Sequence, residues 1–325
     1  MIVARRGPSK LGANARVLVT GGSGYLGAQV LRELGAAAVQ CHALSRTVPP
    51  PEVRELIAWH RTDLLADDVS SLLSAIRPTH CIHLAWEATP GQYRQSLGNY
   101  DWVAATLRLA RSFFSAGGRH FTSAGSCLEY AQPTDACDEA TTPIGGDCPY
   151  AICKIEISRL LAALARDCKA SFADGRIFYL YGPGEPAGKL IRSICQGLIQ
   201  GHAVPLTSGL DFVDFVYRDD AAKALLAMTG AQLNGAFNIG TGRGILVREL
   251  ATRLGEIADK AHLLQFGKVP LGREPARIVA ATSRLISEVG YRPLVEIDEG
   301  LHRCFDFWAA AESQTGAELL YAARK

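Results

Sequence analysis

A tyrosine and a lysine four residues apart are the first groups in this sequence that suggest chemistry. The segment Tyr150-Ala-Ile-Cys-Lys154 follows Pro149, a residue that often begins helices, and this spacing puts both side chains on one helix face. A tyrosine that delivers a proton near neutral pH needs a pKa below its ordinary value of about 10, and a nearby ammonium stabilises its anion. The pair therefore predicts proton transfer by Tyr150 with Lys154 as its partner.

A serine is the expected third member of this group. Ten tyrosines in 325 residues will meet a lysine at this spacing by chance, so the pair alone is weak. The hydroxyl-rich segment 121–130 follows a predicted strand, and Ser126 in it can donate a hydrogen bond to a carbonyl while Tyr150 protonates the same oxygen and a hydride arrives from a cofactor. The alternative is that these serines only cap a turn.

A glycine-rich segment supplies the predicted cofactor site. Thr20-Gly-Gly-Ser-Gly-Tyr-Leu-Gly27 follows the first strand directly and opens a helix. Gly21 permits a tight turn, Gly24 lets a pyrophosphate approach the backbone, and Gly27 lets helix and strand pack closely. The anion then lies on amides at the positive end of the helix. The cofactor-binding residues expected here are Gly21, Gly24, Tyr25, Leu26 and Gly27; the alternative is an ordinary glycine-rich turn.

The end of the second strand favours NADP over NAD. An acidic residue there would bind a ribose 2′-hydroxyl, but this strand ends Ala43-Leu-Ser-Arg46. Ser45 and Arg46 can hydrogen-bond a 2′-phosphate that a carboxylate would repel. NAD stays the alternative, with Arg46 as a solvated charge.

Other strand ends and the catalytic helix complete the predicted cofactor contacts. Asp63 and Leu64 close the third strand near the adenine edge, and Leu84 and Ala85 close the fourth on the nicotinamide side. Lys154 is placed to bind the nicotinamide ribose as well as to serve Tyr150.

The elements that position these residues alternate between strands and helices. Strands are predicted at 16–20, 39–45, 58–62, 80–85, 119–122 and 171–179, and helices at 25–34, 69–76, 100–115 and 150–166. This alternation predicts an α/β fold with a doubly wound parallel sheet. After Tyr181 a helix at 189–200, a strand at 214–217, a helix at 220–228 and the segment 237–240 predict a smaller lobe interleaved with returns to the sheet. A ligand would lie between the two, at the strand C-terminal ends.

Composition excludes several classes of partner. The net charge of +2 provides no global field for nucleic acid or an acidic membrane, and no apolar run approaches the length of about 18 residues that crosses a bilayer. We expect a cytoplasmic protein. Its nine cysteines contain no C-x-x-C pair, so we expect reduced packing residues and no metal site.

Together these residues resemble the extended short-chain dehydrogenase/reductase family, in particular its nucleotide-sugar epimerases, dehydratases and ketoreductases. The resemblance runs from Arg16 to Trp308. It also includes His83-Leu-Ala85, Asn99, Tyr181-Gly-Pro-Gly184, Asp214-Phe-Val-Tyr217 with Asp219, Asn238-Ile-Gly-Thr-Gly242 and Gly272-Arg273. It implies a catalytic triad of Ser126, Tyr150 and Lys154, and a nucleoside-diphosphate sugar as substrate.

The family resemblance also implies a domain division. Residues 1–12 are expected to be a flexible leader, and 13–181 the NADP-binding Rossmann domain, with returns near 212–240. Residues 182–211 and 241–325 are expected to bind the sugar nucleotide. A homodimer formed through the helices 100–115 and 150–166 is expected from the same likeness.

Departures from the family pattern narrow the choice among the reactions of the family. Dehydratases of this family follow the triad hydroxyl with Asp-Glu, whereas Cys127 and Leu128 follow Ser126 here, so dehydration is not expected. Val213 replaces the usual pyrophosphate-binding arginine, which leaves Arg273 for that contact, and Tyr179 replaces the usual substrate-facing asparagine. Cys127, Tyr179 and Arg273 are thus the predicted substrate residues.

The NADP preference favours a reductase among the remaining reactions. A ketoreductase consumes NADPH, whereas a 4-epimerase keeps its NAD bound and returns the hydride. We therefore predict reduction of an NDP-4-keto-6-deoxyhexose, with a 4-epimerase as the alternative. A non-catalytic NADP-binding regulator is a third hypothesis, which loss of the tyrosine or lysine would have marked.

Overall fold

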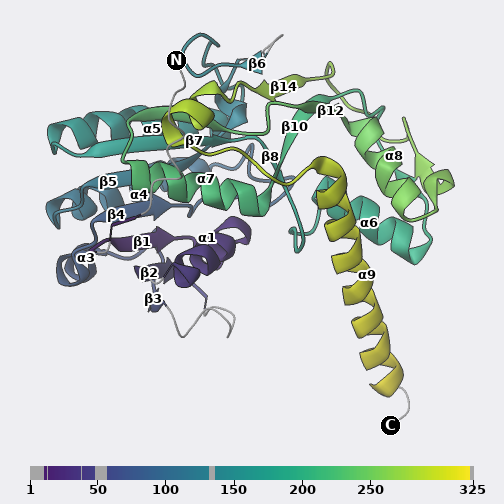
Figure 1. The fold of residues 1–325 in the computed structure, drawn as a ribbon, viewed down its shortest axis with the longest axis horizontal. Helices are drawn as coiled ribbons and strands as arrows, with labels where there is room; N and C mark the ends of the chain where they lie inside the picture. Colours follow the sequence, from purple (N-terminus) through teal and green to yellow (C-terminus); the bar gives the residue numbers. More distant parts are fainter. Residues whose placement is uncertain (1–10, 13, 38, 48–56, 132–135, 323–325) are drawn as a thin grey trace.

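A computed structural model describes residues 11–12, 14–37, 39–47, 57–131 and 136–322, with side chains up to residue 313. Its main body is a parallel sheet with helices on both faces, and a second sheet with its own helices lies beside it (Figure 1). Residues 1–10 of the predicted leader lie outside the described part of the chain.

The main sheet has seven parallel strands in the order β11-β7-β5-β4-β1-β2-β3. The chain moves outward from β1 to β3 and then restarts at β4 on the other side of β1, so the strand order reverses between β1 and β4. In open α/β sheets this reversal marks the ligand crevice. The strands are β1 Arg16–Thr20, β2 Gln40–Ser45, β3 Ala58–Arg61, β4 His80–His83, β5 His120–Ser126, β7 Ser171–Ile177 and β11 Gly235–Ile239.

Side chains that alternate along the strands build a core on each face of the main sheet. In β1, Val17 and Val19 join the cluster beneath α1 (Tyr25–Ala36) and α7 (Arg218–Ala231), whereas Leu18 points to the opposite cluster. That opposite face is covered by α3 Ser70–Ile76, α4 Gly98–Ser115 and α5 Pro149–Asp167. The sheet is buried on both sides, as parallel sheets are.

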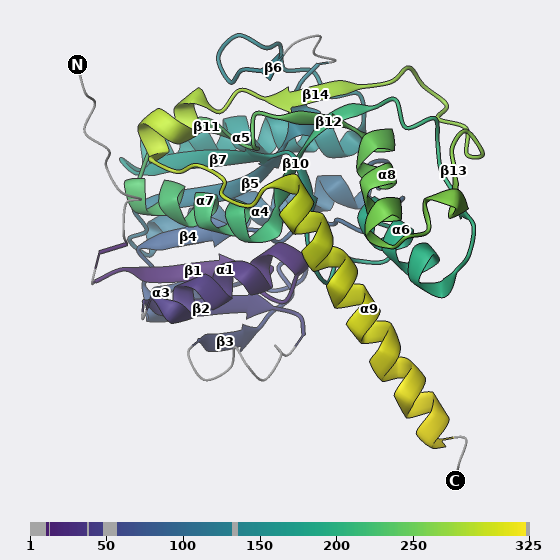
Figure 2. The same ribbon diagram turned by 45° about the vertical axis from the view of Figure 1, so that its right-hand side comes forward.

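The second sheet carries the smaller lobe. Its strands follow the order β12-β10-β14-β6, and β8 pairs with β10. These strands are β6 Ala136–Cys137, β8 Tyr179–Tyr181, β10 Phe212–Tyr217, β12 Gly244–Leu246 and β14 Arg277–Ala280, and a separate pair is formed by β9 Val204–Pro205 and β13 Leu264–Gln265. Its helices are α6 Leu190–Gln200, α8 Val247–Ile257 and α9 Ile297–Ala322. Toward its C-terminal end α9 runs away from the rest of the molecule (Figure 2).

The predicted strands and helices are present, with two informative differences. The strand expected at 119–122 continues to Ser126 as β5, which places the predicted catalytic serine on the strand itself. The strand expected at 171–179 is in fact two strands, because β7 ends at Ile177 in the main sheet and β8 begins at Tyr179 in the second sheet. The domain boundaries stay a prediction.

Two features of composition are visible in the structure. The nine cysteines are free thiols, and all but Cys168 are buried. Among the described residues, no helix combines the length and apolar character that crossing a bilayer requires.

Candidate active site

A cavity of about 820 Å³ lies at the C-terminal ends of the main-sheet strands and extends to the second sheet. Every residue that the sequence places at the cofactor, the catalytic group or the substrate lines this one cavity. The chain segments that supply them are more than 250 residues apart at the extremes, from Gly21 to Arg273. The predicted site is therefore one continuous space.

The glycine turn after β1 has no room for a side chain at Gly21 or at Gly27. Gly21 has a φ of 69°, and a Cβ there would lie 2.7 Å from the backbone nitrogen of Ala85. A Cβ on Gly27 would collide with the Gly21 carbonyl oxygen, so α1 packs directly on the turn. Helix α1 has no side-chain cap and no acidic residue in its first turn. Its free amides and positive end suit a pyrophosphate.

A buried contact fixes the ends of β1 and β4 beside this turn. The Thr20 hydroxyl accepts from the backbone N–H groups of Leu84 (3.2 Å) and Ala85 (3.3 Å) and lies 2.8 Å from Nδ1 of His83. Burial lowers the pKa of His83 to about 3, so the ring is neutral. We assign Nδ1 as the acceptor from Thr20, which leaves the Nε2 proton for Thr106 at 2.9 Å.

The end of β2 presents a hydroxyl and a guanidinium to the cavity. The Ser45 hydroxyl is buried and donates to Ser23 of the glycine turn at 2.6 Å, whereas Arg46 is exposed. Glu87 is the nearby acid: hydrogen bonds from Thr89 lower its pKa, and the charge of Arg46 lowers it further. A positive group thus stands where NAD-binding proteins of this fold place a carboxylate.

The Asp63 and Leu64 corner lies at the same end of the cavity. The Asp63 carboxylate accepts from the backbone N–H of Leu65 at 3.0 Å, so it also shapes its own turn.

Lys154 is buried and held in place by two contacts. Its ammonium donates to the Ala124 carbonyl oxygen at 2.9 Å and lies 3.9 Å from the centroid of a Trp86 ring. Burial lowers the pKa of Lys154 to about 8, against the opposing charges of Asp174 and Glu129. Most of the lysine is therefore charged at neutral pH.

Tyr150 lies in the first turn of α5, and its hydroxyl meets Ser126. Burial raises the pKa of Tyr150, and the hydrogen bond with Ser126 opposes that rise. The Lys154 ammonium lies 5.7 Å from the centroid of the Tyr150 ring. Sequence reasoning expects the lysine to lower this pKa, but burial prevails, and the phenol holds its proton ready to donate.

The substrate end of the cavity contains charged contacts that sequence reasoning did not predict. Arg273 is bound to Asp211 through both terminal nitrogens (2.9 and 2.8 Å), so it faces the cavity with a partner already in place. Arg94 lines the same region and was not expected, because a single arginine in a loop gives no pattern. Burial raises the pKa values of Cys127 and Tyr179, so both are neutral.

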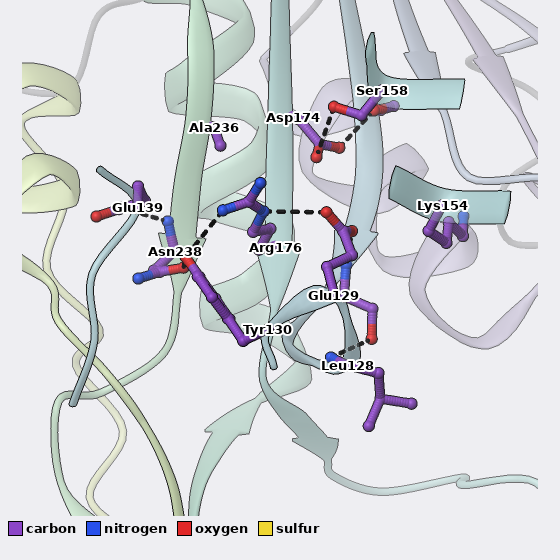
Figure 3. Close-up of polar contacts among 12 residues, drawn as sticks. Leu128, Glu129, Tyr130, Glu139, Lys154, Ser158, Asp174, Arg176, Ala236 and Asn238 are labelled. Carbon is purple, nitrogen blue, oxygen red and sulfur yellow. Dashed lines mark hydrogen bonds and ion pairs between the residues drawn. The ribbon is translucent and has the colours of Figure 1, made fainter. Parts of the chain in front are cut away.

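Behind Ser126 lies a chain of buried polar contacts that sequence reasoning also missed. Figure 3 shows it running from Glu129 through Arg176 and Tyr130 to Asn238. The sequence did contain one sign of these contacts: the charged residues Asp174 and Arg176 lie on one face of an otherwise apolar strand.

Among the described residues, no cluster of His, Cys, Asp and Glu side chains is arranged to hold a metal ion.

The arrangement combines an anion-binding turn, a protonated phenol, a serine donor and a buried ammonium in one cavity. These groups can bind a dinucleotide and protonate an oxygen beside it. The family model described as "NAD dependent epimerase/dehydratase family" matches residues 17–240, more than half of the chain. The chain belongs to the NAD-dependent epimerase/dehydratase family. As a member it is an NAD(P)-dependent enzyme of the extended short-chain dehydrogenase/reductase type.

Relatives within the family differ in reaction. The chain is 26% identical to a UDP-glucose 4-epimerase of Azospirillum brasilense, covering 93% of this chain and 94% of that protein. It is 22% identical to a dTDP-4-dehydro-6-deoxyglucose reductase of Escherichia coli, covering 88% and 95%. The structure of a Thermus thermophilus UDP-glucose 4-epimerase in complex with NAD matches with a TM-score of 0.79 and 25% identity, covering 91% and 99%. The relatives therefore include both an epimerase and a reductase.

Proposed function

We propose that the protein is an NADPH-dependent ketoreductase that acts on a nucleoside diphosphate 4-keto-6-deoxyhexose, with Tyr150 as the proton donor. NADPH, when bound, supplies a hydride to the carbonyl carbon and leaves as NADP+. Tyr150 gives its proton to the carbonyl oxygen, so the ketone becomes an alcohol, and the phenol recovers a proton from solvent. Burial keeps this phenol protonated, so it carries the proton that donation requires.

Ser126 and Lys154 have supporting roles in this proposal. The Ser126 hydroxyl donates to the same carbonyl oxygen and stabilises the charge that develops there. Lys154 binds the nicotinamide ribose and stabilises the tyrosinate that remains after proton transfer. The cofactor contacts proposed from Gly21 to Ala85 complete the site, and Cys127, Tyr179 and Arg273 face the sugar nucleotide.

The end of β2 is the observation that carries the choice of NADPH and of reduction. Ser45 and Arg46 both line the cavity, and neither is acidic. A guanidinium binds a phosphate with charge-assisted hydrogen bonds, whereas an acid at this position would select the free hydroxyl of NAD. An enzyme that takes NADPH from the cellular pool is suited to net reduction.

A nucleotide-sugar 4-epimerase is the second candidate. It is favoured by the similarity to the Azospirillum brasilense epimerase along nearly the whole chain. An epimerase withdraws a hydride and returns it to the other face, so it needs no 2′-phosphate contact. The regulator hypothesis has no support from the site, because Tyr150, Lys154 and Ser126 all face the cavity.

The source of the hydride in the product distinguishes a reductase from a 4-epimerase. Incubation with 4-deuterated NADPH and a panel of NDP-4-keto-6-deoxyhexoses should place deuterium on C4 of the product. Ser126→Ala should slow this by about 10² to 10³, the scale for losing one oxyanion donor. The proposal is wrong if no label transfers and NADPH absorbance stays flat while UDP-glucose is inverted at C4, since that result belongs to the epimerase.

We also propose a cytoplasmic homodimer formed through α4 and α5. The two helices pack side by side, and Tyr100, Ile152 and Leu160 are large apolar side chains exposed on them. Exposed apolar side chains on neighbouring helices suit a symmetric interface.

A further inference from the structure

Ser126 is held by a carboxylate three residues further along the chain. Its backbone N–H donates to Oε1 of Glu129 at 2.7 Å, and its hydroxyl oxygen accepts from the backbone N–H of Leu128 at 3.2 Å. These reciprocal contacts form a capping box around the short 3-10 turn Cys127–Glu129. The accepted bond uses one lone pair of the hydroxyl on the turn, so its proton can be donated on the cavity side, where the hydroxyl meets Tyr150.

The Glu129 carboxylate is fully buried and depends on a buried cation. Its Oε2 accepts from Nε of Arg176 at 3.0 Å, and the Glu129 side chain is 0% exposed. A buried carboxylate without a partner would take up a proton or leave its pocket, because desolvation strongly disfavours the charge. Burial raises the pKa of Glu129, the charge of Asp174 raises it further, and Arg176 opposes that rise. In the structure, one oxygen of Glu129 accepts from the Ser126 amide and the other accepts from Arg176.

Strand register explains how these groups meet. Gly125 in β5, Arg176 in β7 and Asn238 in β11 lie side by side across three neighbouring strands. A Cβ on Gly125 would lie 2.7 Å from Oε1 of Glu129 and 2.8 Å from Oδ1 of Asp174, so the glycine makes room for both carboxylates. Hydroxyl groups of Ser123 (2.7 Å) and Ser158 (3.1 Å) hold Asp174.

The same contacts continue beyond Arg176 to Tyr130 and Asn238 (Figure 3), and Asn238 connects them to the second sheet. Nη1 of Arg176 donates to the Tyr130 hydroxyl at 3.1 Å, which donates to Oδ1 of Asn238 at 2.7 Å. Nδ2 of Asn238 then donates to the carbonyl oxygen of Cys137 in β6 at 2.7 Å. Every bond in this series has a defined donor and acceptor.

We propose that Glu129 is a positioning residue that, with Arg176 as its counter-ion, fixes Ser126 in the orientation needed to donate to the substrate carbonyl. This inference rests on the proposed function of Ser126. Glu129 does not line the cavity, so it acts only through the serine. Glutamine at this position has one carbonyl oxygen, which can serve the Ser126 amide or Arg176 but not both.

A double-mutant cycle tests the proposal. In the deuterated NADPH assay, Glu129→Gln should lower kcat by about 10 to 10², the cost of a misplaced catalytic group, with the KM for NADPH changed by less than about twofold. In a Ser126→Ala background, Glu129→Gln should slow the reaction no further, because the group that it positions is gone. Asp220→Asn is the matched control. Asp220 is a buried carboxylate outside the cavity, and it accepts from two backbone N–H groups. This substitution should lower the free energy of unfolding and leave kcat unchanged.

The outcomes separate the inference from the proposed function. Equal slowing by Glu129→Gln in the wild-type and Ser126→Ala backgrounds overturns the positioning role and leaves the reductase intact. A wild-type rate of deuteride transfer for Ser126→Ala removes the serine from the chemistry and overturns the inference, while the transfer itself still supports reduction. If Glu129→Gln does not fold, Arg176→Lys replaces it in the cycle, because lysine keeps the charge but cannot contact Glu129 and Tyr130 together.

A second measurement needs no substrate. Loss of the bond to Glu129 should speed hydrogen exchange at the Ser126 amide by about tenfold, the equivalent of one hydrogen bond. The Asp220→Asn variant should leave that exchange unchanged. The variant for this measurement is Glu129→Ala, which has no side-chain acceptor for the Ser126 amide. Unaltered exchange in Glu129→Ala contradicts the proposal whatever the reaction proves to be.

Discussion

Removal of the Arg46 charge should weaken NADPH binding and leave NADH binding almost unchanged. A hydrogen bond to a charged group contributes about 1.5 to 3 kcal/mol. Arg46 is exposed at the end of β2, so water and salt screen its contact and the lower end of that range applies. Arg46→Ala should therefore raise the Kd of NADPH about tenfold, since about 1.4 kcal/mol is a factor of ten.

Titration of both dinucleotides, followed by quenching of tryptophan fluorescence, measures this preference. Arg159→Ala is the control, because it removes an exposed arginine of α5 that pairs with Glu156 outside the cavity. Glu87→Gln should act in the opposite direction and tighten NADPH binding. It removes a carboxylate whose negative charge interacts with Arg46 and would repel the 2′-phosphate. The preference should also shrink as salt rises from 0.1 to 1 M, where the screening length falls from about 10 to 3 Å.

Two results would refute this reasoning. Equal Kd values for NADPH and NADH in the wild-type protein would remove the 2′-phosphate contact altogether. A loss of NADPH affinity in Arg159→Ala as large as in Arg46→Ala would show that net charge, and not the end of β2, attracts the cofactor.

Three further predictions concern catalysis, stability and assembly. Tyr150→Phe should abolish turnover while the Kd of NADPH stays nearly unchanged, because it removes only the transferable proton; a wild-type rate in the deuteride assay would place the proton donor elsewhere. Burial lowers the pKa values of His83 and His120 to about 3, so these two rings bind fewer protons in the folded protein than in the unfolded chain below pH 6.5. Their contribution to the free energy of unfolding should therefore fall by about 2 to 3 kcal/mol between pH 7.5 and pH 5.5. The measurement is the difference in urea unfolding between the wild type and a His83→Gln, His120→Gln double variant at the two pH values, and a difference that does not change with pH would contradict neutral burial. Light scattering should give twice the mass of the chain for the wild type and a monomer for Ile152→Arg or Leu160→Arg, and a wild-type monomer would disprove the interface.

Local sequence predicted the parts of the structure that local forces decide. The glycine turn after β1 could be recognised in the sequence because the spacing of its glycines is set by one tight turn and one close helix contact. The pairing of Tyr150 with Lys154 follows from helix geometry alone. Residues placed at strand ends, such as Ser45 and Leu84, were found because parallel strands end at a common edge of the sheet.

Contacts between distant segments were beyond the same reasoning. Glu129 and Arg176 are 47 residues apart, and only the register of β5 against β7 brings them together. Arg273 was assigned to a substrate phosphate, but its pairing with Asp211 depends on how two loops of the smaller lobe meet. The change of sheet after Ile177 was missed because Phe178 and Tyr179 continue the apolar pattern of the strand.

The order in which the chain visits the two sheets limits how this protein can be divided or recombined. It leaves the main sheet after β7, forms β8, α6 and β10 in the smaller lobe, and returns with α7 and β11 before it leaves again. A fragment that ends at Tyr181 would lack β11, which pairs with β7, and α7, which packs on α1. It would expose an open strand edge and a bare apolar sheet face, and such surfaces aggregate. A chimera with a new sugar lobe therefore requires at least three crossovers, two before the α7–β11 segment and one after it, and exchange of a simple C-terminal half will not yield a folded enzyme.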